Sequence, residues 1–372
     1  MRVSYLEHLA CPASILRGGD RCGGRLAVRP GEIPQRFAED DPDELHEGVV
    51  ACERCAAWYP IFGGVLILVK SPLRYLASHF STLISTASLH GELSQEVLGW
   101  LAERHLHQYE GRAMPDTMDS NAALHFERPA ELLAEVPIPE SFRRFLEEWD
   151  RRSPYDLLAE MASHHVEGPQ DRRLVVDAGC GIGGLTDRLA EHFDVALGFD
   201  LSYSSVLVAR SILIGRPRPY QPWIHVERDD FRPLPRQQSP RLNVELFVAD
   251  GTALPLQTES ASAVASANVI EMAPPWALLR EAARLIRPGG LLLFTDPFSF
   301  RVGRFPSGKS HLAEVRKHLE DLGLSAVEER DFIPWIWYTY QRHVQIYFNY
   351  CAAFRKPGTS LQDEAVPGDG SP

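Results

Sequence analysis

The sequence predicts an α/β fold in which helices wrap a mostly parallel sheet, preceded by a small β module. Two observations predict the sheet: strand-like apolar runs alternate with helical runs from Arg172 onward, and a glycine-rich turn follows the first of these runs. A third predicts the module, because four of the six cysteines lie within the first 55 residues, among short strand-like runs. A chain of 372 residues is long enough for two or more domains.

Four regions follow from changes in pattern along the chain. Residues 1–70 form the cysteine-rich module, with runs such as "GVVAC" and "GVLILV". Residues 71–168 place apolar residues three and four positions apart, which predicts a helical connector or cap. Residues 169–356 carry the alternating strands and helices. Residues 357–372 have little apolar content, which predicts a disordered tail.

The alternation changes at two places. Residues 215–243 interrupt it, and an insertion of this length at the rim of a sheet usually shapes a binding site or a lid. Near the end, "AVEERDFIPWIWYTY" and "VQIYFNYCAAFRK" have the pattern of two strands joined by a short turn. We therefore expect a closing antiparallel hairpin.

Composition limits the classes of partner. The formal net charge is -12 and the pI about 5.6, so no global field attracts the molecule to nucleic acid. The start "MRVSYLEHLACP" lacks the basic head and apolar run of a signal peptide, and no apolar stretch is long enough to span a bilayer. We expect a cytoplasmic protein with no membrane segment; its oligomeric state is left open.

The stretch "VVDAGCGIGG", Val175 to Gly184, is the candidate ligand-binding turn. In an open parallel sheet, ligands bind beyond the carboxyl ends of the strands, where a strand turns into a helix. Gly179, Gly181 and Gly183 lack Cβ groups there, so a ligand can press against backbone amides. The spacing is Gly-x-Gly-x-Gly, although Gly184 also satisfies the longer spacing of dinucleotide sites. The glycines alone do not choose between cofactors.

Three acidic residues at strand ends narrow the choice. Asp177 ends the first strand, where a carboxylate suits an amine-bearing cation and repels a pyrophosphate. Asp200 ends the second strand, where it can bind ribose hydroxyls of either cofactor class. Asp250 ends the third and is followed by the small residues Gly251 and Thr252, so it can accept a hydrogen bond from an adenine amine. Together they indicate S-adenosylmethionine.

The motifs "VVDAGCGIGGLTDRLA", "GFDLS", "VADGTALPL" and "LIRPGGLLLFTDP" resemble the successive motifs of class I S-adenosylmethionine-dependent methyltransferases. The resemblance implies a Rossmann-like sheet of seven strands, mostly parallel, with a closing antiparallel hairpin. It also implies that the glycines pass under the amino-acid part of the cofactor, that Asp200 binds its ribose, and that Asp250 and Thr252 flank its adenine. The expected cofactor-site residues are Asp177, Gly179, Gly181, Gly183, Asp200, Leu201, Asp250, Gly251, Thr252 and Asn268.

The cysteines of the module have the spacing of a metal site. Cys52 and Cys55 form a Cys-x-x-Cys knuckle, and Cys11 and Cys22 can complete a tetrahedral thiolate site, for which zinc is the natural ion. Four thiolates leave no open coordination position, so a structural role is expected.

"LACP", "CGGRL" and "CERCAAWYPIFGGVLIL" resemble the small zinc-ribbon family whose members activate RNA and translation-factor methyltransferases and also occur fused to them. That family usually has its first two cysteines two residues apart, whereas here Ser14 occupies the second place and an insert precedes Cys22. We expect Cys22 to be the displaced ligand. The alternatives are His8 or His46 as the ligand, or a site without metal.

The methyl acceptor is less constrained by the sequence. Methyl transfer from a sulfonium is an in-line displacement, so the protein must hold the acceptor and sometimes remove a proton. "ASANVIEMAPP" lacks the Asn-Pro-Pro-aromatic or Asp-Pro-Pro-aromatic signature of enzymes that methylate exocyclic base amines. The candidate catalytic residues are Tyr203, His225, Asn268 and His343. For Asn268, the alternative is a plain strand end.

Two short resemblances concern an imidazole acceptor. "LSYSSVLVARSIL" with "QPWIHV" is similar to the carnosine N-methyltransferase family, and "DPFSF" with "IPWIWYTYQRHVQIY" is similar in layout to the methyltransferase part of ovothiol synthases. Both relatives methylate an imidazole nitrogen. The alternative is that the hairpin aromatics only pack against their neighbours.

The leading hypothesis is therefore a methyltransferase acting on a nitrogen or oxygen of a small, imidazole- or amino-acid-derived metabolite. The enzyme alternative is an RNA or protein methyltransferase with a built-in zinc-ribbon activator. The second alternative is a non-catalytic, cofactor-binding scaffold, against which the intact strand-end carboxylates argue.

Overall fold

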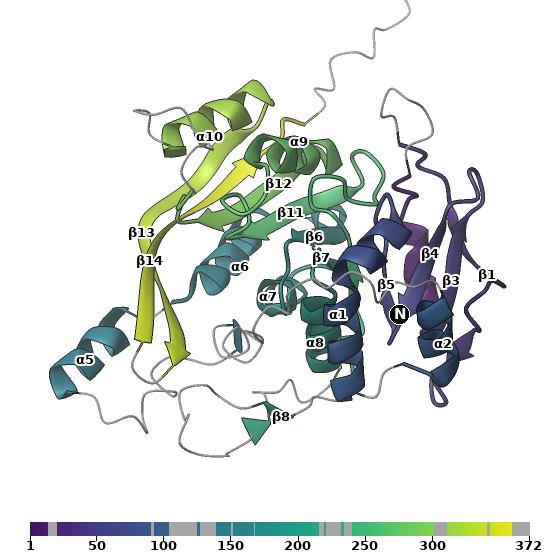
Figure 1. Ribbon diagram of the computed structural model, residues 1–372. Helices are drawn as coiled ribbons and strands as arrows, with labels where there is room; N and C mark the ends of the chain where they lie inside the picture. The colour runs from purple at the N-terminus through teal and green to yellow at the C-terminus, as the bar shows by residue number, and fades with distance from the viewer. Residues whose placement is uncertain are drawn as a thin grey trace, which may run out of the picture.

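The computed structural model describes residues 1–13, 21–90, 93–103, 125–126, 139–149, 152–166, 168–215, 219–220, 232–233, 240–300, 311–340 and 343–358. Within these residues, a small antiparallel sheet lies at one side of a seven-stranded sheet (Figure 1).

The seven-stranded sheet confirms the predicted fold class. Its strand order is β10-β7-β6-β11-β12-β14-β13. The strands are β6 (Leu174–Ala178), β7 (Val195–Asp200), β10 (Val244–Val248), β11 (Ala261–Ala267), β12 (Ile286–Asp296), β13 (Ser325–Tyr340) and β14 (His343–Arg355). The first five in this order are parallel, and β14 runs antiparallel to both β12 and β13, as the expected closing hairpin does.

Helices cover both faces of this sheet. They are the 3-10 helix η3 (Pro169–Arg172), α7 (Gly184–Leu189), α8 (Tyr203–Leu213), α9 (Pro275–Leu285) and α10 (His311–Asp321). Because successive strand side chains point to opposite faces, neighbours in β6 belong to different apolar clusters. Val175 packs with residues of α7 and α8, whereas Val176 packs with residues of α9 and α10.

The cysteine module is a second, antiparallel sheet. Its elements are the 3-10 helix η1 (Val3–His8), β1 (Leu26–Arg29), β2 (Arg36–Phe37), β3 (Leu45–Cys52), β4 (Trp58–Phe62) and β5 (Val65–Leu66). Strand β3 is central, because β1, β2 and β4 all pair with it.

Four described helices lie between the module and the sheet in sequence. They are α1 (Pro72–His90), α2 (Gln95–Glu103), α5 (Glu140–Trp149) and α6 (Pro154–His165). Helix α6 begins with a capping box between Ser153 and Asp156, with Pro154 in its first turn, and it packs against β12, β13 and β14. Of the expected connector, residues 91–92, 104–124, 127–138, 150–151 and 167 lie outside the described residues.

The module is joined directly to the edge of the large sheet. Ile67 forms a parallel bridge with Val248 of β10, and the Leu68 amide donates to the Val248 carbonyl at 2.8 Å. Next to this edge, Arg210 of α8 pairs with Glu44 of the module at 2.9 Å and with Glu245 of β10. The segment after β5 therefore lies along the β10 edge of the large sheet. The expected domain boundaries at residues 70 and 168 stay predictions.

The closing hairpin extends beyond the rest of the sheet (Figure 1). Strand β12 pairs with β14 only as far as Asp296, opposite Tyr350. Strands β13 and β14 continue to pair with each other as far as Tyr340 and His343. The additional residues lie past the carboxyl end of β12, which is the edge where parallel sheets bind ligands.

The expected insertion and tail are described only in part. A short pair, β8 (Pro219–Tyr220) and β9 (Arg232–Pro233), belongs to the insertion, whose other residues from 216 to 239 lie outside the described part of the chain, as does the tail from residue 359. In the part that is described, no helix has both the length and the apolar character needed to cross a bilayer.

Candidate active site

The glycine turn after β6 requires glycine for two reasons. Gly179, Gly181 and Gly183 have φ values of +86°, +53° and +89°, in the left-handed region that favours glycine. A Cβ at Gly179 would also meet Cγ2 of Val269 at 2.2 Å. The turn is tied to β7, because the amides of Gly179 and Cys180 both donate to the carbonyl of Phe199.

Asp177, at the end of β6, has a carboxylate with one oxygen in use. Oδ2 accepts a hydrogen bond from the Thr186 hydroxyl at 2.6 Å, whereas buried Oδ1 has no partner among the described residues. Burial raises the pKa of this carboxyl to about 7, and nearby Asp200 contributes. A buried carboxylate oxygen without a donor fits the ammonium group of an amino-acid ligand.

Asp200 ties the glycine turn to the start of α8. Its carboxylate accepts hydrogen bonds from the amide of Gly181 at 2.9 Å and from that of Ser202 at 2.8 Å. Burial raises its pKa. The next residue, Leu201, keeps a side chain that is 49% exposed, while its carbonyl accepts a bond from Tyr75 of α1 at 2.7 Å. Tyr75 is a contact that the sequence patterns did not indicate.

The loop after β10 carries the third acid. Asp250 is exposed, and its Oδ1 accepts from the amide of Thr252 at 2.9 Å and from the hydroxyl of the same residue at 2.7 Å. Gly251 lies between them. Both bonds close the turn on itself through Oδ1, and Oδ2 of Asp250 has no hydrogen-bond partner among the described residues.

Asn268 follows β11 with a φ of +56°, and its side chain meets the closing hairpin. Nδ2 of Asn349 in β14 donates to Oδ1 of Asn268 at 2.8 Å and to the hydroxyl of Thr295 at 2.9 Å. Asn349 is completely buried, and its Oδ1 has no hydrogen-bond partner among the described residues. Val269, next to Asn268, touches the glycine turn, so this polar cluster borders the cofactor turn.

Two carboxyl groups lie beside this cluster. Asp296, at the end of β12, is fully buried, and its carboxylate accepts from the amides of Phe298 at 2.7 Å and Glu271 at 3.3 Å. Burial, together with the charge of Glu271, raises the pKa of Asp296 to about 7. Burial also raises the pKa of Glu271.

An aromatic row covers the glycine turn from the side of α6. His125 accepts a hydrogen bond at Nδ1 from the amide of Gly184 at 3.1 Å, and its Nε2 lies 3.1 Å from the Tyr155 hydroxyl. Tyr155 meets Trp335 of the hairpin edge to face, with ring centroids 5.1 Å apart. Burial, with Arg188 nearby, lowers the pKa of His125 to about 3, so the imidazole is neutral. The sequence patterns missed His125 and Tyr155.

Of the four expected catalytic residues, the structure describes the side chains of Tyr203 and Asn268, and these two contact different partners. Tyr203 is 2% exposed, and its hydroxyl donates to the carbonyl of Phe62 in β4 at 3.1 Å. This corrects the expectation for Tyr203, because its hydroxyl is bound within the contact between α8 and the cysteine module. His225 lies outside the described residues, and only the backbone of His343 is described, at the start of β14.

The four expected metal ligands come together. The Sγ atoms of Cys11, Cys22, Cys52 and Cys55 all lie within 4.8 Å of one another. The sulfurs of Cys11 and Cys55 are 3.6 Å apart, as are those of Cys22 and Cys52. Tetrahedral zinc with bonds of about 2.3 Å separates its sulfurs by about 3.8 Å, so the donor set fits this ion.

The surroundings of the cysteines also fit thiolate ligands. The Arg54 amide lies 3.3 Å from the Cys52 sulfur and points its hydrogen toward it. Arg54 also donates from its side chain to the Cys22 carbonyl at 2.8 Å. A Cβ at Gly24 would meet the Cys52 sulfur at 2.7 Å, so the chain passes too close for any other residue.

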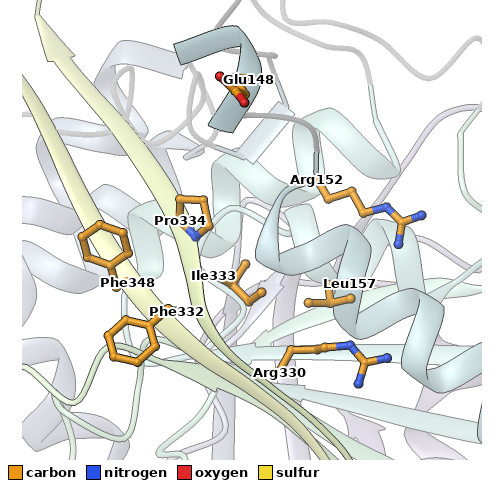
Figure 2. Close-up of a pocket in the computed structure, with 8 residues that line it drawn as sticks. All are labelled: Glu148, Arg152, Leu157, Arg330, Phe332, Ile333, Pro334 and Phe348. Atoms are coloured by element: carbon orange, nitrogen blue, oxygen red, sulfur yellow. The ribbon is translucent and has the colours of Figure 1, made fainter. Parts of the chain in front are cut away.

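A separate hollow of about 740 Å³ lies between the hairpin and helices α5 and α6 (Figure 2). It is lined by Glu148, Arg152, Leu157, Arg330, Phe332, Ile333, Pro334 and Phe348. These residues belong to the hairpin, to α5 and α6, and to the segment between these two helices.

The strand order of the large sheet is consistent with a Rossmann-like methyltransferase fold. Residues 176–294 match the sequence model of a family described as methyltransferase domain. The protein is an S-adenosylmethionine-dependent methyltransferase. No curated protein matches the sequence.

Several solved structures are similar at low identity. A complex between a methyltransferase activator and a putative methyltransferase from Haloferax volcanii is 18% identical, over 66% of this chain and 98% of that one, with a TM-score of 0.36. Magnesium protoporphyrin IX methyltransferase from Synechocystis is 17% identical, over 66% and 99%, with a TM-score of 0.36. A putative sarcosine dimethylglycine methyltransferase from Galdieria sulphuraria is 13% identical, over 60% and 91%, with a TM-score of 0.40.

Proposed function

We propose that this enzyme transfers a methyl group to a nitrogen or oxygen of a small, imidazole- or amino-acid-derived acceptor. The observation that carries the proposal is the buried Oδ1 of Asn349, which has no donor among the described residues beside the cofactor turn. A buried carbonyl oxygen of this kind favours a ligand with an N–H group, because leaving it unpaired costs about 1–3 kcal/mol. An imidazole N–H or an amine meets that need.

The cover over the strand ends supports a small acceptor. The overhanging hairpin and α6 stand on one side of the glycine turn, joined by the contact of Trp335 with Tyr155. Asn268 and Asn349 lie at the carboxyl edge below this cover. A flat ring can stack on such aromatic side chains while its N–H bonds to Asn349. A macromolecular substrate would have to reach the same covered edge, so the cover favours a small acceptor.

The cofactor residues are proposed from the same geometry. Bound S-adenosylmethionine supplies an electrophilic methyl group. In the proposal, Asp177 binds its ammonium group with the free Oδ1, Asp200 binds the ribose, and Asp250 accepts from the adenine amine. The glycines let the amino-acid part approach the backbone, and Leu201, Gly251 and Thr252 border the adenosine. Asn268 and Asn349 orient the acceptor for in-line attack.

Zinc is the proposed ion of the cysteine module. The separations of the four sulfurs and the amide near Cys52 support a closed thiolate site. His8 and His46 are not needed in this proposal, because Cys22 reaches the cluster despite the insert.

An acceptor screen tests the proposed function. Purified protein is first titrated with S-adenosylhomocysteine, and imidazole and amino-acid acceptors are then assayed for methyl transfer. For an acceptor that is used, Asn349→Ala is expected to lower kcat/KM by about 10- to 100-fold and to leave the affinity for S-adenosylhomocysteine unchanged. Phe348→Ala, with an exposed side chain on the same strand, is the matched control. Equal activity of Asn349→Ala and wild type would contradict the proposed acceptor site.

A macromolecular substrate is the alternative that the cysteine module favours. The module lies on the β10 edge, and a hollow beside the cysteines is lined by Arg21 and Arg54 of the module and by Arg284 of α9. These arginines support binding of an anionic partner such as RNA. An affinity for RNA that falls linearly with salt on logarithmic axes would favour this alternative over the small acceptor.

A further inference from the structure

The loop after β10 is held by the segments that carry two of the cysteines. The Ala10 amide donates to the Pro255 carbonyl at 2.7 Å. The Gln257 side chain donates to the Gly23 carbonyl at 2.9 Å. These contacts join the cysteine module to the loop that begins with Asp250. This loop carries the residues that are expected to flank the adenine.

Arg21 contacts both the β10 loop and helix α9. Its guanidinium donates to the Leu254 carbonyl at 2.9 Å and to the Thr252 carbonyl at 3.4 Å. The same group forms a two-pronged ion pair with Glu281 of α9, at 2.6 and 2.8 Å. Glu281 is 5% exposed and Arg284 also binds it, so the position of the Arg21 fork is well fixed.

Arg21 stands next to a metal ligand in sequence. It directly precedes Cys22, and Gly23 directly follows, so both neighbours of this cysteine contact the β10 loop, Arg21 through its side chain and Gly23 through its carbonyl. An ion held by Cys22 restricts the backbone of its neighbours, because binding at such a site contributes to folding locally. The segment that carries Cys22 and the adenine loop are therefore mechanically connected through the Arg21 side chain, in addition to the Ala10 and Gln257 contacts.

We propose that Arg21 is a positioning residue for the adenine side of the cofactor site, and that metal occupancy at the four cysteines raises cofactor affinity through it. The contacts are to backbone carbonyls of residues 252 and 254, so they fix the course of the loop and leave Oδ2 of Asp250 open to a ligand. This inference rests on the assignment of Asp250 and Thr252 to the adenine in the proposed function.

Calorimetry with S-adenosylhomocysteine tests the inference, with bound zinc and the melting temperature measured on each sample. Arg21→Ala is expected to bind about five- to tenfold more weakly than wild type while keeping its zinc. Arg29→Ala is the matched control, because Arg29 belongs to the same module and pairs with exposed Glu53. 5′-Methylthioadenosine, which lacks the amino-acid part, is expected to lose affinity by the same factor.

Two further measurements distinguish a positioning role of Arg21 from an effect on the stability of the whole protein. In the background of Asp250→Ala, the effect of Arg21→Ala on affinity is expected to shrink, since both changes act on the same loop. Removal of zinc from the wild type is expected to weaken S-adenosylhomocysteine binding by a similar factor. Removal of zinc from Arg21→Ala is expected to weaken its binding only slightly further. Unchanged affinity of Arg21→Ala, or full additivity with Asp250→Ala, would overturn the inference. Failure of the wild type to bind S-adenosylhomocysteine would instead overturn the proposed cofactor site.

Discussion

Asp200 has two roles, and a single substitution removes both. Its carboxylate already accepts the amides of Gly181 and Ser202, and the proposed ribose contact adds to these bonds. Asp200→Ala is expected to weaken S-adenosylhomocysteine binding by about 1–3 kcal/mol, measured by calorimetry. Asp194→Ala, which removes an exposed carboxylate directly before the same strand, is expected to leave the affinity unchanged. Full affinity of Asp200→Ala would exclude Asp200 from the ribose site.

Asp177 makes cofactor binding depend on pH. Its pKa of about 7 in the free protein means that the neutral carboxyl is the stable form at lower pH, and that ionising it costs stability as pH rises through 7. An ammonium group beside Oδ1 favours the ionised form. The affinity for S-adenosylhomocysteine is therefore expected to rise from about pH 6 to 8, by at most about tenfold per pH unit.

The controls for this pH dependence are two isosteric changes. Asp177→Asn removes the titrating group and is expected to abolish the rise in affinity. Asp296→Asn is expected to retain it, because Asp296 has a similar pKa but lies at the acceptor side. A pH dependence that persists in Asp177→Asn would show that another group binds the ammonium.

At the scale of the element, the strand–turn–helix unit after β6 depends on glycine for space as well as for backbone angle. Gly179→Ala is expected to abolish measurable cofactor binding, because its Cβ would lie 2.2 Å from Val269 at a φ of +86°. Gly323→Ala has a similar φ of +80° but meets nothing within 4 Å, and it tests the angle alone. We expect Gly323→Ala to lower the melting temperature slightly without changing affinity. Equal behaviour of the two variants would contradict the role of crowding.

The elements that the sequence revealed are those with local signals. Alternating apolar runs predicted the parallel strands, and the glycines and acids at strand ends marked one edge of the sheet. Asn349 and Tyr155 gave no such signal, because the hairpin and α6 bring them to that edge only through long-range packing. Tyr203 was misjudged for a related reason: a short sequence resemblance suggested a role on the acceptor side, but long-range packing brings β4 to α8, where the Phe62 carbonyl accepts a hydrogen bond from the Tyr203 hydroxyl.

At the scale of the whole molecule, the cysteine module and the large sheet are expected to unfold together. Glu245 of β10 is completely buried, pairs with Arg210 and accepts the backbone amide of Arg2 at 3.0 Å, while Arg210 also reaches Glu44. Glu245→Gln leaves the buried arginine short of a charge partner. We expect it to lower the free energy of unfolding by about 3 kcal/mol, near the lower limit for a broken buried pair because Glu44 remains.

Urea unfolding, followed by tryptophan fluorescence and by far-ultraviolet circular dichroism, measures this change. Both signals are expected to shift together to lower urea in Glu245→Gln, since the ion pair ties β10 and α8 to the module. Glu53→Gln removes an exposed pair within the module and is expected to change the free energy of unfolding by less than about 1 kcal/mol. Two separate unfolding transitions, only one of which shifts in Glu245→Gln, would mean that the module is an independent folding unit. The proposed coupling between metal occupancy and the cofactor loop would then have to act within the native state alone.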